Sequence, residues 1–244
     1  MPTRPQSLPR EILDELEPND PRAVRSRRDL ARVNRFMGAP GILARALHRA
    51  LTRVAPSRGP PRLLELGAGD GALTLAVASR LAASWPGVQL TLLDRQRLLS
   101  PATDSAFARL GWPVRCLTVD ALEWARAPLP AHVPPRWSVV LANLFLHHFD
   151  DGRLGELLAA VAMRCDAFVA LETRRGATAR AVAHLLGALV VNDVTRHDGV
   201  LSVRAGFRER ELSVLWPVGE SWRCEEHRAG LFSHLFRATR LRGP

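Results

Sequence analysis

The sequence predicts an α/β fold built on a doubly wound, mostly parallel sheet. Between residues 62 and 171, short apolar runs alternate with amphipathic helical segments. The runs lack strict apolar–polar alternation, as expected for strands buried on both faces. Apolar residues make up 47% of the 244-residue chain, which is enough for the core of one domain. Together these observations exclude a disordered chain, a coiled coil and a membrane-embedded protein.

The first part of the chain is predicted to be a helical extension. Residues 1–20 mix Pro, Arg and Glu and are expected to form a loosely docked lead-in. The pattern is helical from Pro21 to Val54: apolar positions recur at spacings of three and four over residues 29–36 and 42–54, with a break at residues 37–41, which predicts two helices. A linker rich in Pro then leads into the alternating pattern. We therefore divide the chain into an N-terminal extension, residues 1–58, and an α/β domain, residues 59–244.

The α/β domain is predicted to hold five strands, separated by helices, and a terminal hairpin. The five strands cover residues 62–66, 88–93, 114–119, 138–142 and 167–171. The helices cover residues 72–83, 101–110, 153–163, 177–191 and 204–215. Two last apolar runs, 222–228 and 231–241, flank Ala229-Gly230 and predict an antiparallel pair that closes the sheet.

A glycine-rich turn follows the first strand directly. Gly67, Gly69 and Gly71 stand at alternate positions before a helix. Without Cβ atoms the turn can be tight and a ligand can approach its backbone, while the helix beyond offers unpaired N–H groups. The spacing GxGxG differs from the GxGxxG of dinucleotide-binding turns. The glycines could also serve packing alone, so the turn by itself is only moderately specific.

Polar side chains stand at the ends of the next strands. Open α/β sheets bind ligands at the carboxyl ends of their strands. Asp94 ends the second strand and could accept both hydroxyls of a ribose, and Asp120 after the third could accept from an exocyclic amine. Either acid could instead cap a helix or lie in a loop. Asn143 ends the fourth strand and is followed closely by His147 and His148.

Four motifs in this order resemble those of the class I S-adenosylmethionine-dependent methyltransferases. Residues 65–71 resemble the family's first motif, and Asp94 resembles the acid that holds the ribose. The pair Asp120-Ala121 resembles the acidic–small pair beside the adenine, and Asn143 opens the motif after the fourth strand. The resemblance covers residues 62–172 well and the ends loosely. It implies a Rossmann-like doubly wound sheet of seven strands, the last one antiparallel, and an N-terminal helical lid over the pocket.

The resemblance also implies a cofactor. That cofactor would be S-adenosyl-L-methionine, with S-adenosyl-L-homocysteine as its product. Glu65 would lie near the amino acid end of the cofactor, although it could instead cap a helix or pair with an arginine. The cofactor-binding residues predicted in this way are Glu65, Gly67, Ala68, Gly69, Gly71, Asp94, Arg95, Asp120, Ala121 and Asn143.

Three histidines are candidates for catalysis: His147, His148 and His197. A histidine titrates near neutral pH and can take a proton from an oxygen or nitrogen nucleophile. We expect one of the consecutive pair to face the pocket, while each could also be hydrogen-bonded behind it. His197 could form a base with Asp198 as its orienting acid, or the stretch could be a loop in which Asp198 caps the following helix.

Glu172, at the end of the fifth strand, is a further polar residue near the expected pocket. Its position favours the substrate side. It could also belong to a solvated turn or an ion pair.

The substrate class follows from what the motifs lack. Methyltransferases of nucleic-acid amino groups carry an Asn/Asp-Pro-Pro-aromatic motif after strand four, where this chain has Asn143-Leu144-Phe145-Leu146. The three cysteines form no catalytic pair, and no Cys/His spacing typical of a metal site occurs. We therefore expect a small-molecule substrate, with O-methylation of a phenol or enol in quinone or polyketide-type metabolism, and no metal. The alternatives are a methyltransferase of RNA or protein and a non-catalytic binding module.

The charge is the least ordinary property of the chain. Its net charge is +10, and all 34 basic residues are arginines, scattered along the sequence. The scatter favours a coding bias over a polyanion-binding surface, so nucleic acid is an unlikely partner. The N-terminus lacks the apolar core of a signal peptide and the longest apolar run is too short to span a membrane. These features predict a cytoplasmic protein and leave the oligomeric state open.

Overall fold

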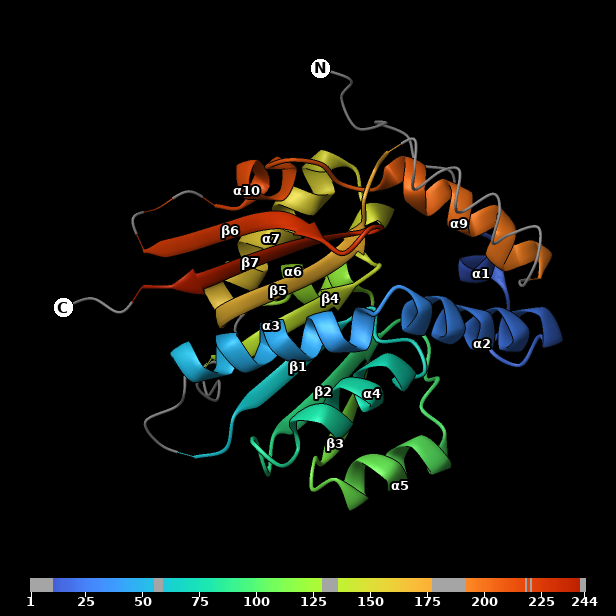
Figure 1. The fold of residues 1–244 in the computed structure, drawn as a ribbon, viewed down its shortest axis with the longest axis horizontal. Coiled ribbons are helices and arrows are strands. Elements are labelled where there is room, and N and C mark those ends of the chain that lie inside the picture. Colours follow the sequence, from blue (N-terminus) through green and yellow to red (C-terminus); the bar gives the residue numbers. More distant parts are fainter. Residues whose placement is uncertain are drawn as a thin grey trace.

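The computed structural model describes residues 11–54, 59–128, 136–176, 192–217, 219 and 221–241. Its centre is a seven-stranded sheet in the order β3-β2-β1-β4-β5-β7-β6 (Figure 1). The strands are β1 Arg62–Leu66, β2 Gln89–Asp94, β3 Val114–Thr118, β4 Trp137–Asn143, β5 Cys165–Thr173, β6 Trp222–Ala229 and β7 Ser233–Arg240.

The first five strands pair in parallel, and β7 runs antiparallel to both β5 and β6. The predicted fold class is therefore confirmed, including the reversed last strand. The last two strands form a hairpin. Although β6 comes first in the sequence, β7 lies next to β5 and β6 lies at the edge of the sheet. Because β1 to β5 are parallel, their carboxyl ends meet at one end of the sheet, where ligands bind in this architecture.

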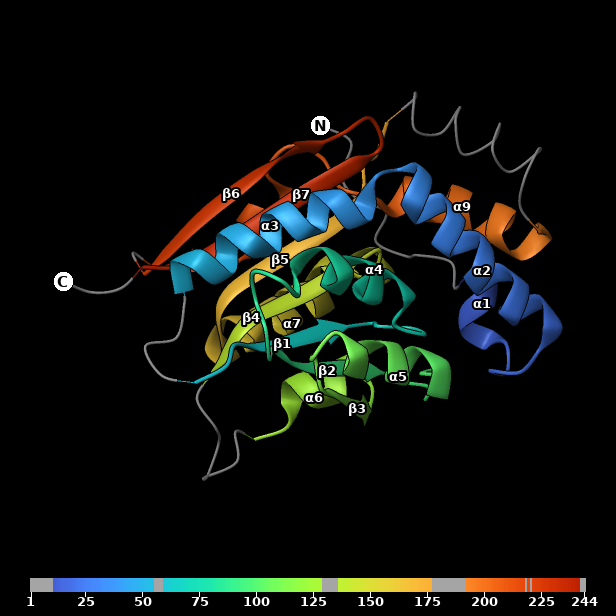
Figure 2. The same cartoon turned by 60° about the horizontal axis from the view of Figure 1, so that its bottom comes forward.

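Helices cover both faces of the sheet. Figures 1 and 2 show α3, α4 and α5 on one face and α6, α7 and α10 on the other. The helical elements are α1 Ile12–Glu15, α2 Pro21–Phe36, α3 Ala39–Val54, α4 Ala72–Leu81, α5 Pro101–Arg109, α6 Ala121–Arg126, the 3-10 turn η1 Leu146–His148, α7 Asp151–Arg164, α9 Asp193–Ala205 and α10 Glu211–Leu215. The short elements α1, α6 and η1 were not predicted from the sequence, and α1 lies in the stretch expected to be a loosely docked lead-in.

Two hydrophobic cores lie on opposite faces of the sheet. On β1, Leu63 packs into the core formed with α3 and α4, whereas Leu64 packs into the core formed with α7. Successive side chains of a strand point to opposite faces, so one strand feeds both cores. Both leucines are fully buried, which accounts for the continuous apolar character of the strand.

The N-terminal helices have different locations. Helix α2 begins at Pro21, where the sequence predicts the helical pattern to start, because Asp20 accepts a hydrogen bond from the Arg22 amide and Pro21 occupies the first turn. Helix α3 packs on the sheet as part of its core. By contrast, α1 and α2 lie together with α9 beyond the carboxyl ends of the strands (Figures 1 and 2). The division at residue 58 remains a prediction.

The region between β5 and β6 differs from its prediction. Residues 204–215 do not form one helix, because α9 ends at Ala205 and α10 begins at Glu211. Between them the Phe207 amide donates to the Thr173 carbonyl at 2.9 Å, and a Cβ on Gly206 would lie 2.4 Å from that oxygen. This close backbone approach to the end of β5 interrupts the helix. The predicted helix over residues 177–191 falls outside the described residues.

The described helices include none that is both long and apolar enough to cross a membrane.

Candidate active site

A cavity of about 760 Å³ lies at the carboxyl ends of the strands. Its floor is formed by residues that follow β1, β2, β3 and β4, and α2 and α9 contribute residues to its walls. The volume falls within the range of small-molecule and cofactor sites. The cavity contains Glu65, Gly67, Ala68, Gly69, Asp94, Arg95, Asp120, Ala121 and Asn143 among its lining, so the structure brings together every predicted cofactor-binding residue except Gly71.

The glycine-rich turn presents an open backbone to this cavity. Gly67 and Gly69 have φ angles of 64° and 56°, in the left-handed region that favours glycine. A Cβ on Gly67 would lie 2.2 Å from the Phe145 ring, whereas a Cβ on Gly69 would meet nothing within 4 Å. Gly67 is therefore needed for packing, and Gly69 leaves room for a ligand. Gly71 instead forms the N-cap of α4.

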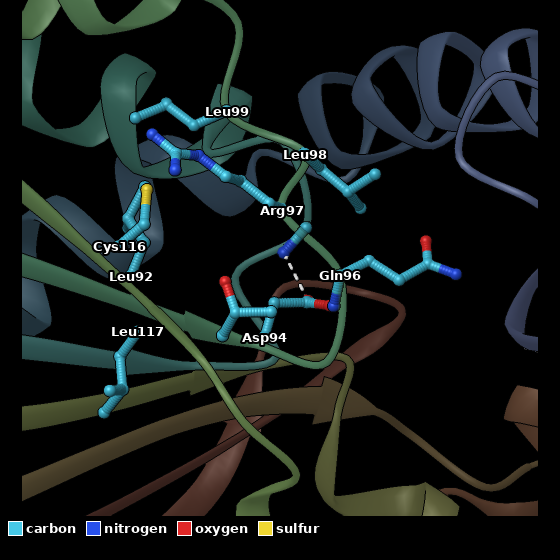
Figure 3. Close-up of a pocket in the computed structure, with 10 residues that line it drawn as sticks. Leu92, Asp94, Gln96, Arg97, Leu98, Leu99, Cys116 and Leu117 are labelled. Atoms are coloured by element: carbon cyan, nitrogen blue, oxygen red, sulfur yellow. Dashed lines mark hydrogen bonds between the residues drawn. The ribbon is translucent and has the colours of Figure 1, made fainter.

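Asp94 joins the glycine turn to β2. Its Oδ2 accepts a hydrogen bond from the Gly69 amide at 2.8 Å, and its Oδ1 accepts from the Gln96 amide at 3.0 Å. The carboxylate thus lies on the cavity wall at the last position of β2. Figure 3 shows a smaller hollow that Asp94 also lines, together with Leu92, Gln96, Arg97, Leu98, Leu99, Cys116 and Leu117.

Asp120 caps a helix and lines the cavity as well. Its Oδ1 accepts from the Leu122 amide at 2.7 Å and from the Glu123 amide at 3.3 Å, which makes it the N-cap of α6. The capping alternative is therefore confirmed for Asp120. Its position on the wall beside Ala121 keeps it within reach of a ligand in the same cavity.

Glu65 is a buried acid at the base of the cavity. Only 3% of its surface is exposed, and the Thr74 hydroxyl donates a hydrogen bond to its Oε2. Burial raises the pKa of Glu65 to about 8, since it disfavours the charged form, and the nearby charges of Asp94 and Asp70 add to this effect. The hydrogen-bond partner of Glu65 is therefore Thr74, and the alternative in which Glu65 pairs with an arginine is wrong.

Asn143 contributes an unsatisfied acceptor. Its Oδ1 is buried and has no hydrogen-bond partner among the described residues. A buried polar atom without a partner is unfavourable by about 1–3 kcal/mol. Asn143 ends β4 and lines the cavity, so a ligand in the cavity could supply the missing donor.

His147 is held from behind by Glu172. Its Nδ1 donates to Glu172 Oε2 at 2.7 Å, and both side chains are buried. The other oxygen of Glu172 accepts from the amides of Phe145 and Leu146 at 2.9 and 2.8 Å. Glu172 therefore fixes both the ring of His147 and the backbone that leads to it. Glu172 is fully buried and is not among the residues that line the cavity, so of its three sequence interpretations, the substrate side, a solvated turn and an ion pair, the ion pair is the one observed.

On the cavity side, His147 meets Glu11, which the sequence analysis did not identify. The Nε2 of His147 lies 3.3 Å from Glu11 Oε1, and the Nε2 of His148 lies 3.8 Å from Glu11 Oε2. Both histidines and Glu11 line the cavity. Glu11 precedes α1 and is 136 residues from His147 in the sequence, so no local pattern could have placed it there.

The electrostatics of this group favour a charged His147. Burial alone would lower its pKa, but the charge of Glu172 and the hydrogen bonds to Glu11 and Glu172 outweigh burial and raise the pKa to about 10. Burial would likewise raise the pKa of each carboxyl, yet His147 holds the pKa values of both Glu11 and Glu172 below their ordinary range. In this arrangement His147 is an imidazolium at neutral pH, which differs from the neutral base that the sequence suggested.

His197 does not line the cavity. Its side chain is half exposed and its Nδ1 lies 3.1 Å from Asp198 Oδ1. Asp198 is not a helix N-cap as the loop interpretation required, because α9 starts at Asp193 with Asn192 as its cap. Instead, the two oxygens of Asp198 accept from the amides of Ile12 and Leu13 at 2.9 and 3.0 Å. Asp198 therefore anchors α1, and with it Glu11.

Comparisons with known proteins give a result at the level of structure alone. No protein-family model matches the sequence, and a search of curated proteins finds no match. The plantazolicin methyltransferase BpumL, in complex with SAH, has a TM-score of 0.61 at 12% identity, over 91% of this chain and 92% of that one. Its structure with a monoazolic desmethylPZN analogue and SAH gives the same TM-score and identity, with 91% of each chain covered.

A further structure is similar to a lesser degree. Magnesium protoporphyrin IX methyltransferase ChlM from Synechocystis PCC 6803, with bound SAH, has a TM-score of 0.49 at 12% identity, over 86% of this chain and 87% of that one. The BpumL match spans nearly the full length of both chains, and the strand order and reversed β7 agree with the expected architecture. The chain therefore has the fold of the class I S-adenosylmethionine-dependent methyltransferases.

Proposed function

We propose that this protein is an S-adenosylmethionine-dependent methyltransferase that methylates an oxygen of a small phenol or enol. One observation carries the proposal. A single cavity joins the glycine turn and strand-end acids, which suit the cofactor, to a histidine pair that suits an ionised oxygen. In this cavity the cofactor's methyl group and the acceptor oxygen would lie side by side. Methyl transfer is a displacement at carbon, and an enzyme contributes to it chiefly by holding the two reactants close and aligned.

The residues of the cavity fit the cofactor. Gly69 leaves open space over its backbone, and the buried Oδ1 of Asn143 has no partner among the residues described. The Asp94 carboxylate would accept from the ribose hydroxyls, Asp120 would accept from the adenine amine, and Glu65 would face the amino acid end. When bound, S-adenosylmethionine supplies an electrophilic methyl group on a sulfonium.

Other residues that line the cavity fit an aromatic or enolic acceptor. Phe145, Phe149 and Leu201 line the cavity with apolar surface, and His147 and His148 supply its polar end. A phenolic oxygen that approaches the histidines would lose its proton more readily beside the positive charge of His147. The rings of His147 and His148 lie with centroids 4.5 Å apart, so the two histidines form one polar end of the cavity. Removal of water from this end would strengthen that interaction.

The solved structures of BpumL support the choice of cofactor. BpumL is a plantazolicin methyltransferase whose structures contain SAH and, in one case, a monoazolic desmethylPZN analogue. Its full-length match in fold, with TM-score above 0.6, makes the same cofactor the natural expectation for this cavity. The specific acceptor rests on the histidine pair and not on the likeness.

A methyltransferase of RNA or protein is the second candidate, because arginines also line the cavity. They are Arg27, Arg95, Arg153 and Arg204. Arg27 donates to the Pro18 carbonyl, Arg153 lies 3.6 Å from Asp150, and Arg95 also interacts within the chain, so at least three of the four already have partners. A polyanion substrate would bind with steep salt dependence, which a small phenol would not.

The experiment is a methyl-transfer assay with isotopically labelled S-adenosylmethionine. Panels of phenols and enols, bulk RNA and unfolded protein are offered in parallel, and the labelled product is identified by mass spectrometry. We expect label on an oxygen of at least one phenol or enol. Label on RNA or protein alone, lost on raising the salt concentration, would select the second candidate instead. Asp104→Ala, an exposed acid on α5 away from the cavity, is the control variant.

A further inference from the structure

Glu11, His147 and His148 form a compact cluster, called the Glu11 cluster below. One ligating atom from each residue lies within 4.8 Å of those of the other two. All three residues line the cavity. Glu11 faces the Nε2 atoms of both histidines, with Oε1 3.3 Å from His147 Nε2 and Oε2 3.8 Å from His148 Nε2.

The composition of the cluster matches a class of metal site. Two imidazoles and one carboxylate, with the remaining positions open, bind zinc in hydrolytic enzymes and other first-row ions elsewhere. Zinc accepts nitrogen and oxygen ligands at about 2.0–2.2 Å. Atoms that already lie within 4.8 Å of one another reach a shared ion with small side-chain movements.

The residues behind the cluster also match such a site. A ligating histidine commonly donates its second ring N–H to a carboxylate, which fixes its tautomer. Glu172 does this for His147: the Nδ1 proton points at Glu172 Oε2 at 2.7 Å. In the neutral ring this leaves the lone pair on Nε2, directed toward Glu11. Glu11 is oriented in turn by the Ser202 hydroxyl, which donates to Oε1.

The backbone supports both halves of the cluster. The amides of Phe145 and Leu146 hold Glu172, and the carboxylate of Asp198 holds the amides of Ile12 and Leu13 directly after Glu11. A ligand set from separate parts of the chain is thus already assembled. The cluster and Glu172 together place two carboxylates around His147, and this excess of negative charge suits a divalent cation.

We propose that Glu11, His147 and His148 bind a divalent transition-metal ion, with Zn²⁺ as the expected occupant, and that an open coordination position receives the acceptor oxygen of the substrate. The role of the ion in binding the acceptor oxygen rests on the proposed methyltransferase function, whereas the metal site itself does not. Binding of the ion displaces the proton from Nε2 of His147. A coordinated phenol loses its proton to water more readily than a free one, so the ion would hold the acceptor as a phenolate without a neutral base.

The test begins with metal binding alone. Protein made without a polyhistidine tag is stripped with a chelator and titrated with Zn²⁺ by calorimetry, and with Co²⁺ by visible absorption, which reports coordination geometry. We expect one site, with proton release that changes with buffer ionisation enthalpy. Glu11→Gln and His147→Asn should each weaken Zn²⁺ binding at least tenfold. His48→Asn is the control, because His48 is an exposed histidine on α3 that pairs with Trp85.

The positioning residue offers a milder variant that should stay folded. Ser202→Ala removes the hydrogen bond to Glu11 and should weaken Zn²⁺ binding by less than Glu11→Gln does, with unchanged circular dichroism. Absence of saturable Zn²⁺ and Co²⁺ binding to the wild type would overturn the site. Binding that Glu11→Gln and His147→Asn leave unchanged, as in an adventitious surface site, would overturn it as well.

A separate measurement addresses the substrate half. The stripped protein should bind S-adenosylmethionine with unchanged affinity but transfer methyl groups at least tenfold more slowly until Zn²⁺ is restored. Full activity in the stripped protein would overturn the role in substrate binding. Metal binding without any binding of S-adenosylmethionine would leave the metal site standing and contradict the proposed function, so the two failures are distinguishable.

Discussion

The carboxylate of Glu172 lies 2.7 Å from Nδ1 of His147, in a place where neither side chain is exposed by more than 3%. The same carboxylate accepts from two backbone amides of the segment that carries the histidine. One acid on β5 therefore sets the position of the loop after β4 and the orientation of its imidazole. The relationship links the central strands of the sheet to the polar end of the cavity.

Loss of the Glu172 charge should strongly destabilise the folded protein. In Glu172→Gln, the amide group faces the donor at Nδ1 of His147, and a buried ion pair is broken from one side. Removal of one partner of such a pair destabilises proteins by about 3–5 kcal/mol. We expect a loss of free energy of unfolding in that range, measured by urea denaturation. Glu156→Gln, which breaks the exposed pair with Arg126, should change it little, and equal losses would argue against the role of burial.

The glycine turn gives a contrast between neighbouring positions. Gly67→Ala places a Cβ 2.2 Å from the Phe145 ring and should reduce both stability and ligand binding. Gly69→Ala meets no neighbour, so only the left-handed backbone opposes it, at about 1–2 kcal/mol. We expect Gly69→Ala to melt close to the wild type yet bind S-adenosylmethionine at least tenfold more weakly. Wild-type affinity in this variant would show that the cofactor does not pass over Gly69.

Asn143 should contribute to the affinity for S-adenosylmethionine and not to the stability of the fold. Its Oδ1 has no partner among the described residues, so Asn143→Ala removes a desolvated atom without breaking a bond. The variant should keep or slightly raise its melting temperature. The affinity for S-adenosylmethionine should fall about tenfold, which corresponds to one hydrogen bond of about 1.4 kcal/mol. A fall in thermal stability with unchanged affinity would assign Asn143 to the fold.

The pKa of Glu65 predicts a pH dependence of stability. It is about 8 in the fold against an ordinary value of 4.5, so the folded protein binds this proton more tightly than the unfolded chain. The stabilising contribution is full below pH 4.5 and declines by up to about 1.4 kcal/mol per pH unit as the pH rises toward 8. We expect the stability of the wild type to fall over this window relative to Glu65→Gln, which cannot ionise. Parallel curves from the two proteins would mean that Glu65 is ionised in the fold.

Asp198 should control the N-terminal segment. Asp198→Ala leaves the amides of Ile12 and Leu13 without their acceptor, and Glu11 then loses its support. Hydrogen exchange at residues 12 and 13 should quicken, while the exchange of the sheet stays as in the wild type. Asp193→Ala is the matched control, because Asp193 is an exposed acid on the same helix whose ion pair is with Arg196. Unchanged exchange in Asp198→Ala would contradict the anchor.

The sequence predicts the parallel core of this fold well and the C-terminal helices poorly. The bounds of β1 agree with the prediction, because a buried parallel strand is a continuous apolar run between turn residues. The end of α9 was missed, because it depends on the approach of Gly206 to the Thr173 carbonyl, a tertiary contact. Local periodicity carries no information on such an approach.

The same distinction holds for the site. The location of Asp94 and Asn143 at the cavity could be predicted, because each ends a parallel strand. The carboxyl ends of parallel strands meet at the same end of an open sheet. Glu11 could not be predicted, since its position depends on Asp198 and Ser202 in a helix nearly 190 residues later. The charge state of His147 follows from Glu11 and Glu172, so its chemistry was also beyond reach of the sequence.

The central claim is that this cavity binds S-adenosylmethionine through the end of β2. Calorimetric titration of the wild type and of Asp94→Ala with S-adenosylmethionine tests it most directly. The account predicts one site per chain in the wild type and at least tenfold weaker binding in Asp94→Ala, with Asp104→Ala indistinguishable from the wild type. A wild-type protein that binds no S-adenosylmethionine, or an Asp94→Ala variant of undiminished affinity, would contradict it.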